Sequence, residues 1–155
     1  MAVERLKARV MLARPSDLDM VMEIETLSFS SPWSRQVFIE ELDRDFAFLK
    51  VLRTCSGRVV AFINYWVVAD EIHVLNVATH PDWRHQGLGR RLMQHAIRVG
   101  RQRSARLVTL EVRRSNQNAL ALYDSLGFLA VGVRPRYYEN REDAIVMVLR
   151  FREEP

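Results

Sequence analysis

The sequence contains little cysteine and little lysine, and it has no long apolar run. Its single cysteine, Cys55, excludes an internal disulfide and is typical of a reducing compartment. No segment approaches the roughly 18 consecutive apolar residues that a membrane span requires. Residues 1–7 show no apolar stretch of the kind that a secretory signal needs. We therefore expect a cytoplasmic protein with no membrane partner.

The basic residues are almost all arginine, because Lys7 and Lys50 are the two lysines among 23 basic residues. Against 19 acidic residues they leave a net charge of +4, spread along the chain. Such a charge suits a polyphosphate ligand or a ribosomal neighbour but requires neither. The sequence lacks a basic stripe with interleaved aromatic residues, so we expect no direct nucleic-acid binding.

A length of 155 residues predicts a single domain that is large enough to bury a sizeable core. Apolar periodicity and turn signals predict the order β-α-α-β-β-β-α-β-α-β-β, a mixed α/β sheet. The expected strands are 8–13, 46–54, 59–68, 72–79, 106–112, 128–133 and 144–151. The expected helices open at residues 15–17, at Ser34, within residues 84–89 and at Asn116, and Gly127 closes the last one.

A glycine-containing segment, Arg84-x-x-Gly87-x-Gly89, lies where a strand leads into a helix. Unpaired amide groups at a helix N-terminus bind phosphate oxygens, and glycine lets the backbone approach an anion closely. A dinucleotide fold would need a third glycine where Leu92 stands, and a mononucleotide loop would need a lysine before Ser or Thr. Taken alone, the segment is also compatible with a tight turn and a helix cap.

Two further residues carry reactive groups in the second half of the chain. Glu111 interrupts an apolar strand between Leu110 and Val112, and Tyr123 lies on the helix that follows. Taken alone, each has an ordinary alternative: a carboxylate near a strand end is commonly a surface residue, and a helical tyrosine commonly packs half-buried. The four histidines, His73, His80, His85 and His95, show no zinc spacing, so we expect no metal site.

The combination of segments resembles the GNAT superfamily of N-acetyltransferases and, within it, the bacterial RimI branch. The matching segments are 76–79 with Arg84-x-x-Gly87-x-Gly89-Arg90, 110–113 with Asn116 and 121–128, and Arg134-x-x-Tyr137-Tyr138 with 142–144. Pro32-Trp33-Ser34 also resembles the early loop of that branch. Two positions depart from the pattern: Thr79-His80 precedes Pro81 in place of an apolar and an acidic residue, and residues 139–141 form a shorter loop.

The resemblance implies a GNAT domain over residues 1–155, with a mostly antiparallel sheet of about six to seven strands, about four helices and a splayed central strand. It implies acetyl-CoA as co-substrate and transfer to the N-terminal alanine of the eighteenth small-subunit ribosomal protein. The coenzyme-binding residues implied are Val77, Ala78, Thr79, Arg84, His85, Gln86, Gly87, Leu88, Gly89, Arg90 and Asn116. Glu111 is implied as general base, Tyr123 as general acid, and Trp33, Tyr137 and Tyr138 as acceptor-binding residues.

These residue types suit amine acetylation. An α-amine with a pKa of about 8 must lose a proton before it attacks, and a carboxylate can accept that proton. A tyrosine hydroxyl can protonate the leaving thiolate. The alternatives left open are an acetyltransferase for other protein N-termini, lysine side chains or small amines, and a catalytically silent coenzyme-binding or ribosome-associated module.

Overall fold

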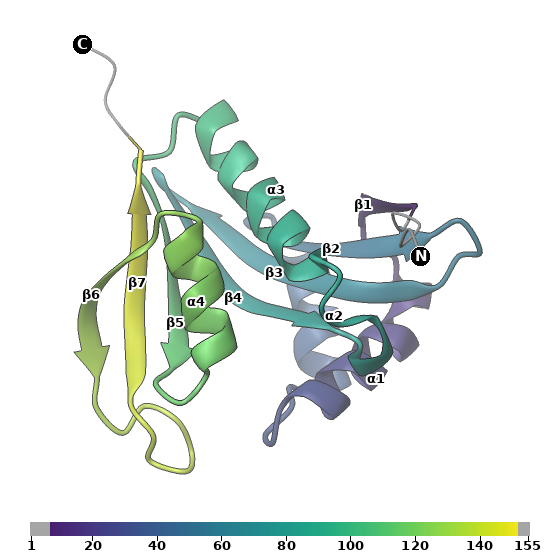
Figure 1. Cartoon of the computed structure of the whole chain (residues 1–155). Helices are drawn as coiled ribbons and strands as arrows, with labels where there is room; N and C mark the ends of the chain where they lie inside the picture. Colours follow the sequence, from purple (N-terminus) through teal and green to yellow (C-terminus); the bar gives the residue numbers. More distant parts are fainter. Residues whose placement is uncertain (1–6, 152–155) are drawn as a thin grey trace, which may run out of the picture. The chain divides into compact units, whose positions relative to one another are not determined.

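The computed structural model describes residues 7–151, which form seven β-strands and four α-helices in the predicted order (Figure 1). The absence of a signal segment was predicted mainly from residues 1–6, which lie outside the described residues. The strands are β1 Ala8–Leu12, β2 Ala47–Thr54, β3 Val59–Val68, β4 Glu71–Thr79, β5 Leu107–Arg113, β6 Leu129–Arg134 and β7 Ala144–Arg150. The helices are α1 Leu18–Ser28, α2 Arg35–Asp43, α3 Leu88–Gln102 and α4 Gln117–Ser125, with short 3-10 turns at Pro15–Asp17 and Pro81–Trp83.

The helix ends follow from local capping chemistry. The Ser34 hydroxyl accepts a hydrogen bond from the Val37 amide at 3.3 Å, and the Asn116 side chain accepts one from the Ala119 amide at 3.1 Å. Each satisfies an amide that has no acceptor within its helix. Beyond α4, Gly127 takes a φ of +96°, a conformation that favours glycine. The start of α2 and the closing glycine of α4 were therefore predicted correctly.

The sheet has the strand order β1-β2-β3-β4-β5-β7-β6. The pairs β1–β2, β5–β7 and β6–β7 are antiparallel, whereas β4 and β5 are parallel, as a crossover through α3 requires. The parallel pairing runs from Glu71↔Leu107 to Val74↔Leu110, although β4 continues to Thr79. The predicted mixed α/β fold with a mostly antiparallel sheet is confirmed.

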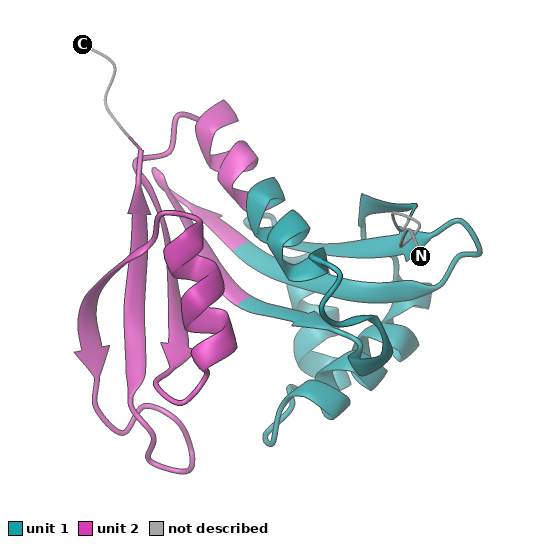
Figure 2. Ribbon diagram, in the orientation of Figure 1, with its two compact units in different colours: residues 1–65, 76–95 teal, residues 66–75, 96–155 magenta. Residues whose placement is uncertain are grey.

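The chain divides into two compact units, which Figure 2 colours separately. The first contains residues 1–65 and 76–95, and the second contains residues 66–75 and 96–155. Strands β3 and β4 each contribute residues to both units. The prediction of a single domain therefore stays a prediction.

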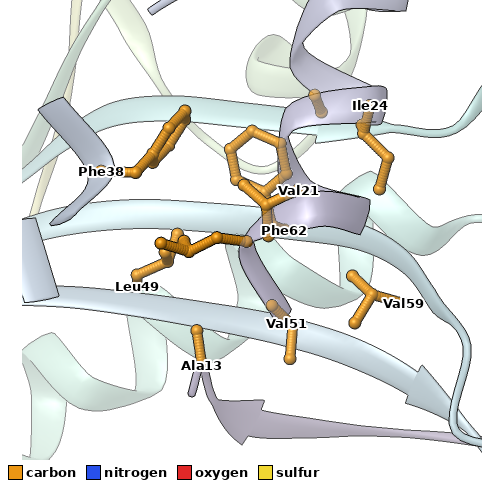
Figure 3. Packing of buried hydrophobic residues seen from close by; sticks show 10 residues of the cluster. Ala13, Val21, Ile24, Phe38, Leu49, Val51, Val59 and Phe62 are labelled. Atoms are coloured by element: carbon orange, nitrogen blue, oxygen red, sulfur yellow. The ribbon is translucent and has the colours of Figure 1, made fainter. Parts of the chain in front are cut away.

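The core of the first unit lies between helices α1 and α2 and strands β2 and β3 (Figure 3). Phe38 of α2 meets Phe62 of β3 edge to face, with ring centroids 5.7 Å apart. Val21 and Ile24 of α1 are completely or almost completely buried. The other residues of this cluster are Ala13, Leu18, Leu49, Val51, Val59 and Ala78. Because Ala78 of β4 belongs to this cluster, the packing also fixes α1 beside the strand that carries the first part of the candidate site.

The second unit packs α4 and the last strands through aromatic contacts. Tyr123 of α4 lies 5.9 Å from Phe128, measured between ring centroids, and both rings are buried. The unit therefore holds Tyr123 in a fixed, apolar environment.

At Gly100 of α3 an added Cβ would lie 2.8 Å from the Phe151 ring, so a side chain there would clash.

Two further observations concern the described helices and the single cysteine. Among the described helices, none combines the length and apolar character that spanning a bilayer requires. Cys55 is exposed in the turn between β2 and β3 and is not part of the core.

Candidate active site

The end of β4 presents the residues predicted to contact the coenzyme arm. Ala78 is buried in the core of the first unit, while Val77 and Thr79 are partly exposed. Their backbone lies beyond Val74, where the described pairing with β5 ends. Strand amides and carbonyls beyond such a pairing are suited to hydrogen bonding with an extended ligand.

The loop between β4 and α3 has the geometry of an anion-binding turn. His85 has a φ of +64° and Gly87 a φ of +77°, and nothing lies within 4 Å of the position that a Gly87 Cβ would occupy. His85, Gln86 and Gly87 are exposed, whereas Leu88 is buried and anchors the first turn of α3. The first amides of a 15-residue helix lack acceptors within the helix and carry the positive end of its dipole. These residues fit a pyrophosphate group.

Arg84 lies at the start of this loop. Its Nε donates to the Thr79 carbonyl at 3.2 Å, and its Nη2 donates to the Ser28 hydroxyl at 3.3 Å. The side chain thus closes the loop onto the end of β4 while keeping its charge exposed. Arg91, in the first turn of α3, donates to the Ala8 carbonyl at 2.6 Å.

His80 explains the unusual Thr79-His80-Pro81 sequence. It is buried, its Nδ1 accepts from the Asp82 amide at 3.1 Å, and its Nε2 lies 3.3 Å from Glu23 Oε1. The imidazole therefore caps the short 3-10 turn, in place of the acidic residue that commonly precedes this proline.

Trp33 lies in the loop between α1 and α2. Its ring packs 5.3 Å from the Phe38 ring, measured between centroids, and contacts the core of the first unit. Its backbone amide donates to Oε1 of Glu25 at 3.0 Å. The ring therefore has a packing role, and its role in acceptor binding stays a prediction.

Glu111 is the centre of a polar group in the second unit. It lies on β5 opposite Val146 of β7, and its side chain is 28% exposed. Arg134 Nε lies 3.2 Å from Glu111 Oε1. A hydrogen bond to Glu111 raises the pKa of Tyr137, which keeps the Tyr137 hydroxyl protonated. The predicted base and one predicted acceptor-binding tyrosine are thus in direct contact.

Tyr123 and Tyr138 are the other two tyrosines of this unit. Burial raises the pKa of Tyr123 to about 12, and the nearby Tyr138 adds to the effect. Burial also raises the pKa of Tyr138 to about 12, against the opposing effect of Arg113. Both hydroxyls are therefore protonated at neutral pH, which is the state that a proton donor needs.

Arg113 holds the loop that carries the two tyrosines 137 and 138. Its guanidinium lies 4.0 Å from the centre of the Tyr138 ring and bonds to Glu139 at 2.7 Å. Glu142 accepts hydrogen bonds from Arg113 at 3.4 Å and from the Ser115 amide at 2.7 Å. The short loop is therefore fixed by charge-assisted contacts to the end of β5.

Asn116 has a structural task besides its predicted one. Its Oδ1 caps α4, so only its Nδ2 would remain to donate a hydrogen bond to a coenzyme arm. The side chain is exposed.

The structure groups the predicted residues by unit. Trp33 and residues 77–79 and 84–90 belong to the first unit, and Glu111, Asn116, Tyr123, Tyr137 and Tyr138 belong to the second. Sequence reasoning assigned no role to Arg134, Arg113 or Glu25. The position of Glu25 on the apolar face of α1 was the available signal for the last of these. Within residues 7–151, no three His, Cys, Asp or Glu side chains are grouped as metal ligands would be.

Comparison with known proteins decides the family. The model of the acetyltransferase (GNAT) family matches residues 18–128. This chain is a member of the GNAT acetyltransferase family. The match includes Glu111 and Tyr123 as well as the complete loop between β4 and α3. The chain is therefore an acyltransferase, and the predicted family is confirmed.

Individual GNAT relatives resemble the chain over most of its length. The "[Ribosomal protein bS18]-alanine N-acetyltransferase" of Escherichia coli (strain K12) is 39% identical over 137 residues, which cover 86% of this chain and 91% of that protein. A Bacillus subtilis (strain 168) protein that carries this name provisionally is 37% identical over 145 residues, 92% of this chain and 95% of its own. The crystal structure of the Escherichia coli ribosomal-protein-S18-alanine N-acetyltransferase matches with a TM-score of 0.86 and 36% identity, covering 96% of both chains.

Proposed function

We propose that this protein transfers the acetyl group of acetyl-CoA to the N-terminal alanine of ribosomal protein bS18. The supporting observation is the identity of 36–39% with enzymes of that name over 86–96% of the chain. We also propose that residues 1–155 act as one acetyltransferase domain, since the family match includes residues of both units.

Residues 77–79 and 84–90 would hold the coenzyme. The amides at the start of α3 would bind the pyrophosphate, and the open space at Gly87 lets a phosphate approach the backbone. The β4 backbone and Asn116 Nδ2 would hydrogen-bond to the pantetheine arm. When bound, acetyl-CoA supplies an activated thioester.

Glu111 and Tyr123 would move the two protons of the reaction. Glu111 accepts a proton from the α-ammonium group, directly or through water, so that the free amine can form the new amide bond. Tyr123 donates its proton to the thiolate as the thioester bond breaks. The second proton that the nitrogen loses as the amide forms returns to Tyr123, so one proton ends on the thiol and one on Glu111. A Tyr123 pKa of about 12 keeps that proton available at neutral pH. Tyr137 and Tyr138 would bind the acceptor peptide beside Glu111.

The test is to incubate the protein with acetyl-CoA and peptides that begin Ala-Arg, Met-Lys and Ser-Glu, together with an N-blocked lysine peptide. Mass spectrometry then locates the acetyl group. We expect acetylation of the alanine α-amine. Acetylation of only the lysine side chain would contradict the N-terminal assignment, and no transfer at all would favour a silent coenzyme-binding module.

Glu111→Gln tests the role of the base. The amide cannot accept the proton but preserves the shape, so we expect kcat to fall about 100-fold or more with little change in acetyl-CoA affinity. A large loss of coenzyme affinity would show that Glu111 serves coenzyme binding instead.

A further inference from the structure

The C-terminal half of α1 is linked to the segment that carries the predicted coenzyme site, within the first unit. Glu25 Oε2 accepts from Asn76 Nδ2 at 2.7 Å, Glu23 Oε1 lies 3.3 Å from His80 Nε2, and the Ser28 hydroxyl accepts from Arg84 at 3.3 Å. One face of α1 thus follows the chain from the middle of β4 to the start of the loop.

Of these three links, the one at Glu25 is buried. Glu25 and Asn76 are 1% and 9% exposed, whereas the Glu23 side chain is 54% exposed and the Arg84 contact lies at the surface. A hydrogen bond to a charged group away from water is far stronger than a contact at an exposed site. The Glu25 contact therefore dominates the connection.

The same carboxylate also holds the loop between α1 and α2. Its Oε1 accepts from the Trp33 amide, while Oε2 accepts from Asn76. Asn76 directly precedes Val77, the first residue predicted to contact the coenzyme arm. One buried side chain therefore connects the loop of Trp33 to the coenzyme strand.

Packing alone does not account for a carboxylate at this position. Its neighbours on the helix, Val21 and Ile24, are apolar and buried, and a leucine would fill similar space without desolvating a charge. Burial raises the pKa of Glu25 in spite of its two hydrogen bonds, which shows that desolvation is the larger effect. What the carboxylate provides and a leucine cannot is the pair of hydrogen bonds.

We propose that Glu25 is a positioning residue that holds the Trp33 loop against Asn76 and so shapes the binding site for the acceptor peptide. This rests on the proposed function, in which that loop contacts the acceptor. Asn76 is kept in place by the sheet, whereas the loop has no strand ladder of its own. Loss of the carboxylate should therefore release the loop and leave the strand in place.

The first experiment measures amide hydrogen exchange by NMR and needs no activity. In Glu25→Leu we expect the Trp33 amide to exchange about tenfold faster or more, while the His80 amide, bonded to the Val60 carbonyl at 2.9 Å, keeps its wild-type rate. Glu25→Gln still offers an acceptor to Trp33 and should stay within about threefold of wild type. Glu40→Leu, on the exposed face of α2, is the matched control and should change neither amide.

The second experiment measures steady-state kinetics with the Ala-Arg peptide and acetyl-CoA affinity by calorimetry. In Glu25→Leu we expect the peptide KM to rise about tenfold or more and the acetyl-CoA Kd to stay within about twofold, with Glu25→Gln restoring most of the peptide affinity. Should Glu25→Leu fail to fold, Glu25→Met, with its more adaptable side chain, takes its place.

Each failure has a distinct meaning. Unchanged Trp33 exchange in Glu25→Leu would overturn the connection itself. Faster exchange with an unchanged peptide KM would overturn the positioning role. If wild type acetylated no peptide, the proposed function would fall, while the exchange result would still show whether Glu25 holds the loop.

Discussion

Arg53 and Asp17 are joined by two hydrogen bonds, Nη1 to Oδ1 at 2.6 Å and Nη2 to Oδ2 at 2.7 Å, across 36 residues of sequence. Their side chains are 11% and 2% exposed. The pair ties the turn that precedes α1 to β2, and Asp17 also accepts from the Arg14 amide. The hydrogen bond from Arg53 is the main cause that lowers the pKa of Asp17, against burial, which raises it.

Asp17→Asn should therefore lower the free energy of unfolding at pH 7 by about 3 kcal/mol, because it leaves a largely buried guanidinium without its counter-charge. A lowered carboxylate pKa contributes stability above the unfolded value of about 3.9, and that contribution is lost as pH falls through the folded value. The difference between wild type and variant should thus shrink below about pH 4. Urea unfolding at several pH values measures it. The control is Asp19→Asn, whose exposed pair with Arg35 should contribute less than about 1 kcal/mol.

Gly87→Ala tests the coenzyme loop. The alanine would meet no neighbour, so its cost is the strain of a φ of +77°, about 1 kcal/mol. If the loop relaxes to relieve that strain, the amides move and acetyl-CoA affinity falls. Gly57→Ala is a matched control, since Gly57 has a φ of +89° and equally open surroundings in the turn between β2 and β3. Both variants should lose similar thermal stability, but calorimetry should show weaker coenzyme binding for Gly87→Ala alone. Equal Kd values for both variants would exclude the loop from coenzyme binding.

Tyr123→Phe should reduce kcat about 100-fold while leaving acetyl-CoA affinity unchanged, because it removes only the proton donor. A pKa of about 12 means that deprotonation of Tyr123 should cause no loss of wild-type activity below about pH 10. The measurement is kcat as a function of pH between about pH 6 and about pH 10. An alkaline decline in wild type that disappears in Tyr123→Phe would contradict the pKa of about 12 but not the role of proton donor, whereas an unchanged kcat in Tyr123→Phe would contradict that role. Tyr65→Phe controls for the loss of a buried hydroxyl in the other unit.

Arg113→Ala should loosen the loop that carries Tyr137 and Tyr138, because Tyr138, Glu139 and Glu142 lose a shared partner. We expect the peptide KM to rise about tenfold with acetyl-CoA affinity preserved. Arg114→Ala is the neighbouring control, since its contact with Asp143 at 3.5 Å joins more exposed side chains. Equal kinetic effects of the two substitutions would argue against a specific role for Arg113.

The sequence predicts the elements well where local chemistry determines them. Ser34 caps α2 as expected, and α3 buries the apolar residues that recur at helical spacing, Leu88, Leu92, Met93, Ala96 and Ile97. The short 3-10 turn after β4 was not predicted, because that turn depends on a hydrogen bond to the His80 imidazole. A histidine cap carries no strong local signal.

The candidate site could be predicted only in part, for a related reason. Glu111 and Tyr137 belong to recognisable segments, but their contact depends on how the loop between β6 and β7 folds back over β5. The ion pair of Glu111 with Arg134 likewise joins residues that lie 23 positions apart in the sequence. No role for Glu25 could be predicted, because its two partners come from another loop and another strand.

The exposed position of Cys55 affects how the reaction can be followed. Acetyl transfer releases coenzyme A, which carries a free thiol, so a chromogenic thiol reagent would report turnover. An accessible cysteine reacts with the same reagents and adds a background proportional to the enzyme concentration. Because Cys55 is the one cysteine of the sequence and lies in a surface turn, Cys55→Ser should remove this background without disturbing the core. In that variant every thiol detected would come from the coenzyme.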